Sequence, residues 1–561
     1  MSLDLTGLQE EFPELDTEPL PREEGATAYR ILVPDLKWGK QFEWAELRLP
    51  KGFPEHGLAK VFLSQDAVLR IPHVEDTGAL CISGDPGPSF GRTPEERIYY
   101  TLLAYRDDFL YPWMAGDLDG DFAEEPRNYW WIAVDRKRSE RNPVSLVVTV
   151  DECPKKAVVK EGSLLLPGRI VIADDGQQAI TEHIIRSLGN KARQRLRVVV
   201  AHVPIPNTLT PSTWPRSNSD LHRILKGRLN RFQKDAFARP IRSRKRGNHR
   251  IVILRNSACS FAYLLPGGPP TTVPHGNSNK AFPSLKDAIP LSVTRFDPSW
   301  TVSRDQCPAV TQRQCKHVLI VGAGALGSPV VDVLAKSGVG KMTLVDPQLV
   351  ESANFCRHLL GAESFGQSKA MAVADRVNLG HPSTNVTPVI GHVERWLQVN
   401  CLDGVDLILD LTGEPDVRWH LDQARAKSPC AMMVGWMEPY VTAAHVCILP
   451  AETPWMRIVS GDPHDPLNDL QAITWPPDVY RQEPGCSSRF QSYTAAAAAY
   501  AVAIVSEHAL NQLDRSLDEP KVVSWVRGQK YLDDHWEGLE LREWAESAKN
   551  HDGILIERPF L

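Results

Sequence analysis

The sequence predicts an α/β protein whose C-terminal part is a doubly wound domain, preceded by an α+β domain and a mixed middle region. Its 561 residues exceed what one ordinary hydrophobic core can hold. Strand-length runs separated by turn residues lie near the N-terminus, and from His317 onward strands alternate with helical patterns. We therefore expect three regions, over residues 1–150, 151–310 and 311–561.

The composition is that of a folded globular protein. Hydrophobic residues make up 42% of the chain and charged residues 24%, which argues against a disordered, collagen-like or coiled-coil chain. The 69 acidic and 63 basic residues give a formal net charge of -6, so no overall positive field favours nucleic acid. We expect no direct role in nucleic-acid binding.

Signals for export, membrane insertion or zinc binding are not evident. The N-terminus lacks a basic stretch followed by an apolar core, and the longest apolar stretch, Ala495–Val505, covers about half a membrane span. The ten cysteines contain no C-x-x-C pair. We expect a cytoplasmic protein that uses neither a membrane nor structural zinc.

The first region reads as an antiparallel meander followed by helices. Three runs between Ala28 and Val74 show partial period-two alternation and are separated by turn residues. A helical pattern covers Thr93–Leu110. Asp117, Asp119 and Asp121 alternate like a calcium loop, but Phe122 occupies the place that needs glycine, which favours a surface turn.

The middle region contains strand-like runs between loops rich in proline, serine and glycine, and its fold and role are not predicted. It includes the basic run Arg239–Arg250, which could bind an acidic partner or nucleic acid. A solvated loop is the favoured interpretation.

A glycine-rich loop opens the third region. The apolar run Val318–Val321 leads into Gly322-Ala-Gly324-Ala-Leu-Gly327 and then a helical pattern. In a strand, turn and helix context such glycines let the backbone approach phosphate at a helix N-terminus. Asp346 ends the next strand, where a carboxylate can accept hydrogen bonds from ribose hydroxyls. The pattern predicts a nucleotide site.

Residues further along favour an adenylating enzyme over a dinucleotide oxidoreductase. Asn354 and Arg357 follow Asp346, and Lys369 begins a helical pattern. A nicotinamide site has no evident need for two cations here, whereas attack of a carboxylate on the α-phosphate of ATP requires neutralisation of developing charge.

These motifs resemble the ThiF/MoeB/ubiquitin-activating-enzyme family over about residues 295–510. The glycine loop, the terminal aspartate, N-x-x-R and G-x-x-K occur in that family's order. The resemblance implies a Rossmann-like adenylation domain that uses ATP and Mg²⁺. It assigns Gly322, Gly324 and Gly327 to the phosphates, Asp346 to the ribose, and Asn354, Arg357 and Lys369 to the triphosphate and the adenylate.

The magnesium ligand departs from the family pattern. Where the family has D-x-T-D-N, this chain has Asp410-Leu-Thr412-Gly413-Glu414, so the second aspartate is replaced by glycine. Asp410 remains as the expected Mg²⁺ ligand, and Glu414 is a possible substitute. The zinc cysteines of many relatives are absent, so no zinc is expected.

Two cysteines are candidate acyl carriers, a role that needs exposure and a lowered thiol pKa. Cys486 stands in a predicted turn before a long helix, where the helix N-terminus and Arg489 would favour the thiolate. Cys81 follows the meander in Pro72-His73 and Gly78-Ala-Leu-Cys81, which resembles the ubiquitin-conjugating-enzyme fold. That family's histidine-proline-asparagine motif lacks its asparagine here. His73 is interpreted either as part of the reaction or as a buttress of the loop.

Together the domains resemble the bacterial fused activating–conjugating enzymes of CBASS antiphage systems. The resemblance implies adenylation of a protein C-terminus, capture at Cys486, transfer to Cys81 and attack by a target amine. It also implies a cGAS-like nucleotidyltransferase or ubiquitin-like protein as the activated partner, and a homodimer. A sulfur-carrier adenylyltransferase with an accessory module, a nicotinamide oxidoreductase and a pseudoenzyme scaffold remain alternatives.

Overall fold

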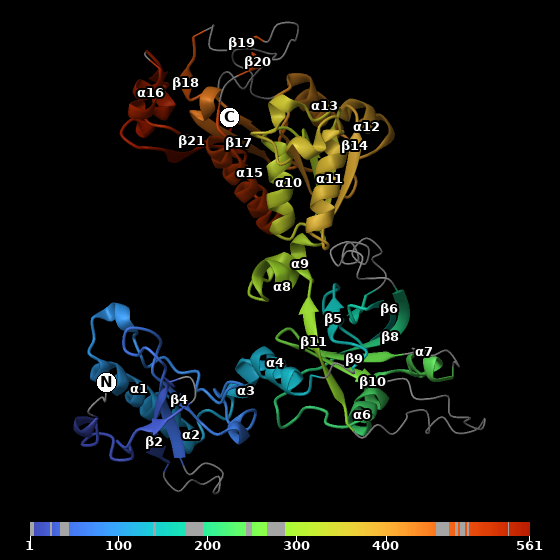
Figure 1. The fold of residues 1–561 in the computed structure, drawn as a ribbon. Helices are drawn as coiled ribbons and strands as arrows, with labels where there is room; N and C mark the ends of the chain where they lie inside the picture. Colours follow the sequence, from blue (N-terminus) through green and yellow to red (C-terminus); the bar gives the residue numbers. More distant parts are fainter. Residues whose placement is uncertain are drawn as a thin grey trace. The chain divides into compact units, whose positions relative to one another are not determined.

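The computed structural model describes residues 5–22, 25–33, 44–138, 142–174, 194–242, 249–265, 287–455, 470–476, 481–482, 489–490, 493–536 and 538–560. The chain divides into two compact units (Figure 1). One consists of Met1–Gly176 with Leu188–Thr294, and the other of Gln177–Ser187 with Arg295–Leu561. The border at Thr294 lies before the boundary expected at residue 310.

The first unit begins with an antiparallel meander, as the sequence predicts, and the short strand β1 makes it four-stranded. Its strands pair in chain order: β1 (Leu20–Pro21), β2 (Thr27–Leu32), β3 (Trp44–Leu49) and β4 (Lys60–Phe62). The helical segments that follow are α1 (Pro94–Ala104), a π-helical stretch (Tyr105–Leu110), α2 (Tyr111–Ala115), α3 (Asp121–Glu124) and α4 (Pro126–Arg136). Thr93 and Glu96 form a capping box that starts α1. Ile98 of α1 packs in one core with Leu47 and Val61 of the sheet.

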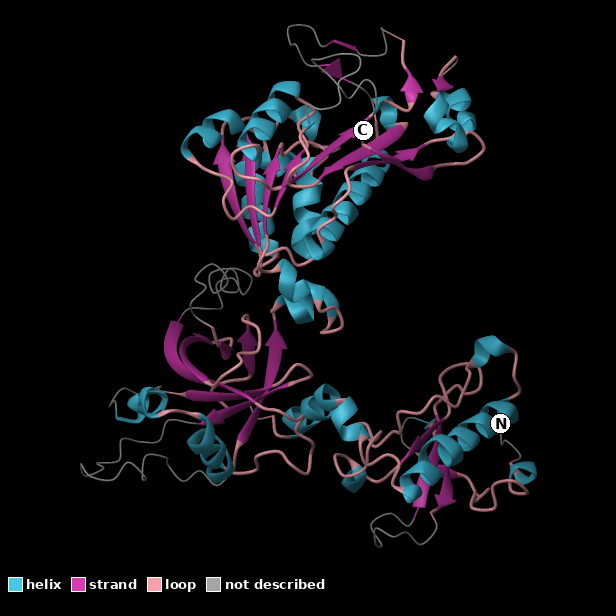
Figure 2. Ribbon diagram, turned by 180° about the vertical axis from the view of Figure 1, so that it is seen from behind, coloured by secondary structure: helices cyan, strands magenta, loops and turns pink. Residues whose placement is uncertain are grey.

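The middle region, left without a fold by the sequence, is a closed seven-stranded barrel (Figure 2). Its strands are β5 (Leu146–Thr149), β6 (Val158–Leu166), β7 (Ile170–Ile172), β8 (Gln194–Pro204), β9 (Arg250–Arg255), β10 (Ser260–Leu265) and β11 (Ile289–Arg295). Val198 and Val200 of β8 belong to one buried cluster, and the alternate residues Ala201 and Val203 belong to another. The second cluster includes Leu221 of α6 (Asn218–Arg228), and α7 (Arg231–Arg242) follows.

Arg250 corrects the interpretation of the basic run as a solvated loop. It lies at the start of β9 with a side chain that is 1% exposed, and burial lowers the pKa of its guanidinium to about 10. Residues 243–248 of the run lie outside the described residues.

The second unit is built on an eight-stranded sheet with the order β14-β13-β12-β15-β16-β17-β21-β23. The first five strands of that order are parallel, and the last three join antiparallel. Their bounds are β12 (His317–Val321), β13 (Lys341–Asp346), β14 (Asn385–Ile390), β15 (Leu407–Asp410), β16 (Ala431–Met437), β17 (Ala443–Leu449), β21 (Lys521–Val526) and β23 (Ile554–Pro559). This is the doubly wound sheet that the sequence predicts.

Helices cover both faces of this sheet (Figure 2). One face packs against α10 (Gly327–Lys336), α11 (Lys369–Gly380) and α15 (Ala495–Arg515), and the other against α12 (Val393–Val399) and α13 (Pro415–Arg425). The parallel strands read 3-2-1-4-5 in chain order, so the connections after β12 and β15 leave in opposite directions. In such sheets ligands bind outside the carboxyl ends of the strands at this switch point.

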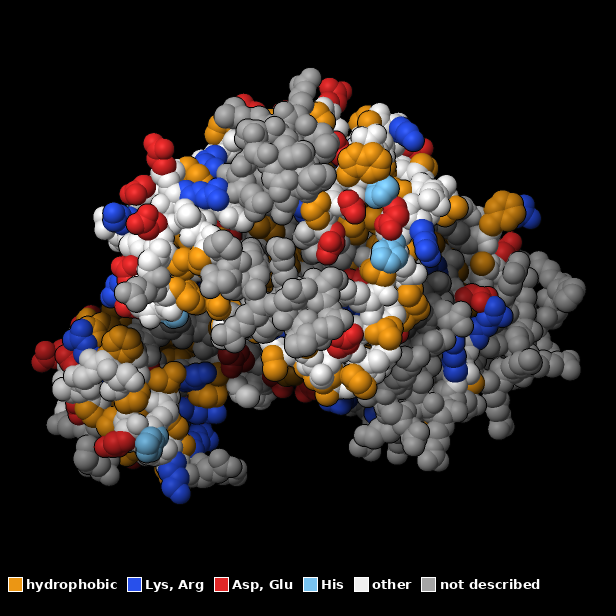
Figure 3. All heavy atoms as spheres, turned by 90° about the horizontal axis from the view of Figure 1, so that it is seen from above, with side chains coloured by type: hydrophobic (Ala, Val, Ile, Leu, Met, Phe, Trp, Pro, Cys, Tyr) orange, Lys and Arg blue, Asp and Glu red, His pale blue; other side chains and the backbone are white. Residues whose placement is uncertain are grey.

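Smaller elements complete the second unit. They are α8 (Pro298–Ser303), α9 (Ala309–Arg313), β18 (Ile473–Thr474), β19 (Arg481–Gln482), β20 (Arg489–Phe490), α16 (Gln529–His535) and β22 (Glu540–Leu541). Among the helices described, none combines the length and apolar character needed to cross a membrane. On the face drawn in Figure 3, acidic, basic and hydrophobic side chains are interspersed.

Candidate functional site

The glycine loop joins β12 to α10 at the switch point, and its three glycines meet different constraints. Gly322 has a φ of +94°, and a Cβ at Gly327 would lie 1.9 Å from the carbonyl oxygen of Gly322. Both positions therefore require glycine for the backbone path. A Cβ at Gly324 would meet nothing within 4 Å, so this backbone borders open space that a phosphate could approach.

Asp346 ends β13 and is tied to the glycine loop. Its Oδ2 accepts a hydrogen bond from the Ala323 amide at 2.7 Å, and its Oδ1 accepts one from the Gln348 amide at 2.8 Å. The side chain is buried. Each carboxylate oxygen has a further lone pair, so hydrogen bonds from ribose hydroxyls remain compatible with this arrangement.

Lys369 begins α11 and places a buried ammonium in this region. Its Nζ donates to Oε1 of Gln348 at 2.7 Å, and the residue is 5% exposed. Burying a charge is costly unless it is paired. Among the described residues, only the neutral Gln348 side chain hydrogen-bonds to this ammonium. An anionic ligand is therefore well suited to this position.

Arg357 and Asn354 lie in the short segment between β13 and α11. The Arg357 guanidinium lies 4.8 Å from the ring centre of Tyr493 and donates from Nη2 to the carbonyl oxygen of Ala353 at 3.0 Å. Oδ1 of Asn354 accepts from the amide of Glu351 at 2.9 Å, which closes the local turn. The roles of both residues toward a triphosphate stay predictions.

His358 is a site residue that sequence reasoning did not assign. Its Nε2 lies 2.5 Å from the carbonyl oxygen of Ala323, and its Nδ1 accepts from the Leu360 amide at 3.1 Å. These partners place the proton on Nε2. Burial, together with the charge of Lys369, lowers the pKa of the imidazole, so it is a neutral tether between the glycine loop and this segment. Its position directly after Arg357 was the available signal.

Asp410 ends β15, across the switch point from the glycine loop. Its Oδ1 accepts from the Thr412 amide at 3.1 Å and from the Thr412 hydroxyl at 2.6 Å. Its Oδ2 is buried and has no hydrogen-bond partner in the described part of the chain. Burial raises the pKa of this carboxyl, and the charge of Arg418 opposes that rise.

The unpartnered oxygen of Asp410 fits a role as a magnesium ligand. Mg²⁺ in nucleotide enzymes is commonly held by one or two carboxylates together with substrate phosphates. The described residues contain no group of three or more histidine, cysteine, aspartate or glutamate side chains that could hold a metal on their own. Glu414 is close enough for its charge to add to the pKa rise of Asp410.

Cys81 is exposed in the loop that follows the N-terminal meander. Its amide donates to the carbonyl oxygen of His73 at 2.8 Å. Partial burial raises the pKa of the thiol, the charges of Glu75 and Glu125 raise it further, and only Lys60 acts in the opposite direction. The exposure of this residue agrees with the acyl-carrier hypothesis, but the expected lowering of its pKa is wrong.

His73 supports this loop, in agreement with its interpretation as a buttress. Its Nε2 lies 2.7 Å from Oδ2 of Asp121, and its backbone amide donates to the hydroxyl oxygen of Tyr129 at 2.8 Å. The residue has a φ of +60°, an uncommon conformation for a side chain of this size. Asp121, the last of the three alternating aspartates, therefore starts α3 and pairs with His73.

Cys486 lies outside the described residues. It falls in the connection between β19 and β20, which pair antiparallel through Arg481 with Phe490 and Gln482 with Arg489. The long helix α15 begins only at Ala495, after β20, and the hydroxyl of Thr494 caps it. The role of the helix N-terminus and of Arg489 toward the Cys486 thiolate stays a prediction.

A buried carboxylate anchors the chain that precedes this connection. Oε2 of Glu438 accepts from the Trp475 indole at 2.8 Å and from the Ile473 amide at 3.2 Å. Its Oε1 lies 2.8 Å from Nε2 of His445, whose Nδ1 lies 2.7 Å from the hydroxyl of Ser524. This network fixes residues 472–475 to β17 and β21.

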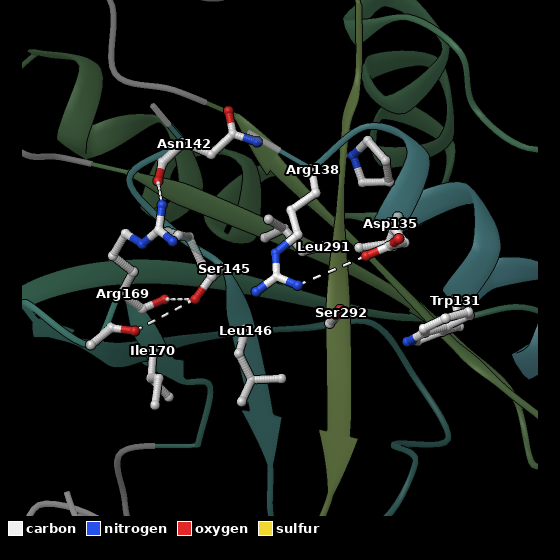
Figure 4. Close-up of a pocket in the computed structure, with 14 residues that line it drawn as sticks. Trp131, Asp135, Arg138, Asn142, Ser145, Leu146, Arg169, Ile170, Leu291 and Ser292 are labelled. Atoms are coloured by element: carbon white, nitrogen blue, oxygen red, sulfur yellow. Dashed lines mark hydrogen bonds and ion pairs between the residues drawn. The ribbon is translucent and has the colours of Figure 1, made fainter. Parts of the chain in front are cut away.

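A separate cavity of about 310 Å³ lies in the first unit between the C-terminal half of α4 and strands of the barrel (Figure 4). Arg138 pairs with Asp135 at 3.8 Å, and Arg169 donates to the carbonyl oxygen of Asn142 at 3.2 Å. None of the predicted site residues lines this cavity. The Arg138–Asp135 pair lies at the end of α4, and Arg169 bonds to the segment between α4 and β5.

Comparison with known proteins agrees with the fold of the second unit. Residues 310–543 match the ThiF family. The second unit thus contains a Rossmann-like ThiF domain, as the glycine loop, Asp346 and the switch point indicate.

Two enzyme names recur among the similar curated proteins. Over 113 residues, 20% of this chain and 28% of the relative, the chain is 34% identical to an adenylyltransferase and sulfurtransferase UBA4 of Yarrowia lipolytica. It is 26% identical over 240 residues, 40% of each chain, to an ATP-dependent ubiquitin transferase-like protein Cap2 of Vibrio cholerae. A Cap2 of Pseudomonas aeruginosa is 23% identical over 422 residues, 71% of this chain and 72% of the relative.

The alignments with the first relatives span about a quarter to two fifths of those proteins' length. Among solved structures, E. coli MccB with ATP shares 15% identity and a TM-score of 0.29, covering 38% of this chain and 61% of MccB.

Proposed function

We propose that this protein uses ATP to adenylate the C-terminal carboxylate of another protein and passes the acyl group through Cys486 to Cys81. The observation that carries the adenylation step is the buried Lys369 ammonium, whose hydrogen-bond partner among the described residues is the neutral side chain of Gln348. The backbone of Gly324 borders open space after β12. Asp346 and Asp410 stand at the ends of the neighbouring strands.

In the first step, a carboxylate oxygen attacks the α-phosphorus of ATP, a P–O bond forms, and pyrophosphate leaves with the electrons of the broken P–O bond. Gly324 offers its backbone to the phosphates, Asp346 accepts from the ribose, and Lys369 with Arg357 offsets charge that develops at phosphorus. Asp410 would hold Mg²⁺, which supplies charge neutralisation for the phosphates when bound.

In the later steps the acyl group moves between sulfur atoms. The Cys486 thiolate attacks the acyl carbon and AMP leaves, which gives a thioester. The Cys81 thiolate then attacks that thioester and releases Cys486, and a target amine finally displaces Cys81 to form an amide. Carrying both cysteines on one chain raises the effective concentration of one for the other where the linking chain lets them reach each other.

The partner proposal rests on the relatives named Cap2, one of which aligns with 71% of this chain. We infer a bacterial antiphage role in which a cGAS-like nucleotidyltransferase is activated and joined to a cellular target. A homodimer built on the ThiF domain is supported by exposed apolar side chains around the start of α11. Leu349 is 53% exposed, Phe365 67% and Met371 41%, and Leu349 is bridged to Ser368.

A sulfur-carrier adenylyltransferase is the second candidate. The relatives named adenylyltransferase and sulfurtransferase favour it. In that case the N-terminal domain would serve as a binding module.

Exchange of radioactive pyrophosphate into ATP tests the adenylation step. The full chain is mixed with ATP, Mg²⁺ and a cGAS-like nucleotidyltransferase that has an intact C-terminal tail. Lys369→Ala and Arg357→Ala are each expected to lower the exchange rate by about 100-fold or more. Lys336→Ala is the matched control, because this lysine is exposed at the far end of α10 and pairs with Asp332. Equal rates for Lys369→Ala and wild type would contradict the proposal.

A further inference from the structure

The loop of Cys81 lacks the asparagine that the conjugating-enzyme resemblance leads one to expect, so a different group must stabilise an oxyanion there. Transfer of an acyl group to a thiolate passes through a tetrahedral intermediate whose oxygen carries negative charge, and a positioned hydrogen-bond donor lowers that barrier. This donor is expected among the polar groups near Cys81.

One residue connects Cys81 to a buried hydroxyl. The carbonyl oxygen of His73 accepts from the Cys81 amide, and the amide of the same residue donates to the hydroxyl oxygen of Tyr129, each at 2.8 Å. The pairing of the His73 ring with Asp121 holds this residue in its left-handed conformation. The peptide groups of His73 therefore fix the Tyr129 hydroxyl relative to Cys81.

The hydroxyl of Tyr129 can donate a hydrogen bond. A phenol has one O–H donor besides its acceptor lone pairs, and here the oxygen is already an acceptor for His73. No described residue accepts the Tyr129 proton. The ring is held by an edge contact with Phe122, with centroids 4.7 Å apart.

Electrostatics keep that proton in place. Burial, followed by the charges of Glu125, Asp121 and Cys81, raises the pKa of Tyr129 to about 12. The phenol is therefore protonated whenever Cys81 reacts, and Cys81 is close enough to act on it. A protonated, desolvated hydroxyl is a strong donor to a nearby oxyanion.

We propose that the Tyr129 hydroxyl donates the hydrogen bond that stabilises the oxyanion formed when Cys81 takes up or releases an acyl group. This inference rests on the proposed role of Cys81 as an acyl carrier. As the Cys81 sulfur bonds to the acyl carbon, the carbonyl π electrons move to oxygen, which accepts the hydrogen bond. When the carbonyl re-forms, the sulfur of the donor thioester leaves with its bonding electrons. Tyr129 keeps its proton throughout.

Two reactions of the same thiol separate this role from simple support of the loop. Acylation by a synthetic peptide thioester forms an oxyanion, whereas alkylation by iodoacetamide does not. Both rates are measured at Cys81 by peptide mass spectrometry, with the full chain carrying Cys486→Ala. We expect Tyr129→Phe to slow acylation roughly 10- to 100-fold and to change alkylation less than about two-fold.

Tyr105→Phe is the matched control. Tyr105 is a buried tyrosine of the same domain whose hydroxyl has no hydrogen-bond partner among the described residues, so its loss should leave both rates unchanged. Thermal unfolding of both variants checks that the domain stays folded.

Three results would overturn the inference: equal slowing of acylation and alkylation by Tyr129→Phe, unchanged acylation in that variant, or no acylation of Cys81 in the wild-type loop. Because the peptide thioester supplies the acyl group without ATP, failure of the proposed adenylation would leave this assay readable.

Discussion

Cys81 is a thiol whose surroundings oppose its ionisation. Partial burial and two carboxylates raise its pKa, although the residue is exposed. A thiolate of high pKa is a strong nucleophile, and it is a slow leaving group once acylated. These properties suit a carrier that holds its acyl group until an amine is positioned, more than a thiol that reacts with any electrophile.

The charges around Cys81 can be tested by alkylation. Glu75→Gln removes a negative charge that raises the thiol pKa, so a larger share of Cys81 should be thiolate at pH 8. Alkylation should therefore be roughly two- to five-fold faster, which is the effect expected of one charge screened by solvent. Lys60→Met removes the opposing charge and should slow alkylation by a similar factor. Iodoacetamide kinetics with detection at Cys81 provide the measurement. A change in the same direction for both variants would show that local structure, and not charge, sets the reactivity.

At the scale of single residues, the motif positions were predictable and their partners were not. Asp346, Lys369 and Asp410 follow from strand and helix patterns and from a family resemblance. His358 and Tyr129 act through hydrogen bonds to backbone groups of Ala323 and His73, and no local sequence pattern encodes such contacts. The raised pKa of Cys81 depends first on burial and also on the charge of Glu125, which lies far along the chain.

The turn between β12 and α10 uses glycine for two different physical reasons, which substitution can separate. Gly327→Ala would place a methyl group 1.9 Å from the carbonyl oxygen of Gly322 and should destabilise the second unit by at least about 2 kcal/mol. In Gly324→Ala the added methyl group has no atom within 4 Å, so the free energy of unfolding should stay unchanged.

ATP binding should respond to Gly324→Ala even though the stability of the second unit does not. If phosphates occupy the open space at Gly324, Gly324→Ala should weaken ATP binding at least about tenfold in equilibrium dialysis while the melting temperature stays within about 1 °C of wild type. Unchanged ATP affinity in this variant would argue against the assigned position of the phosphates.

Among the larger elements, the doubly wound sheet was predictable because each strand and helix has its own hydrophobic periodicity. The glycine loop marks the first strand and the first helix, and the remaining elements alternate after it. The barrel was not predictable. Its closure depends on pairs such as parallel β8 with β9 and antiparallel β10 with β11, which join segments separated by long connections. The helical patterns of α10 and α15 were visible in the sequence, and α15 begins at Ala495 as its alanine run indicates.

At the scale of the whole molecule, two proposed chemical centres lie on one chain. The region that matches the ThiF family carries the proposed nucleotide site and the connection that contains Cys486, and the N-terminal region carries Cys81. The division of labour predicts that adenylation is independent of Cys81 and that transfer is not.

Intact-mass analysis of the full chain tests this relay most directly. The protein is incubated with ATP, Mg²⁺ and a cGAS-like nucleotidyltransferase, and wild type is compared with Cys81→Ala and Cys486→Ala. We predict a thiol-reducible adduct on wild type, a reducible adduct confined to Cys486 in Cys81→Ala, and no adduct in Cys486→Ala. Pyrophosphate release without any acyl group on Cys81 would contradict the relay and leave the N-terminal domain as a binding module.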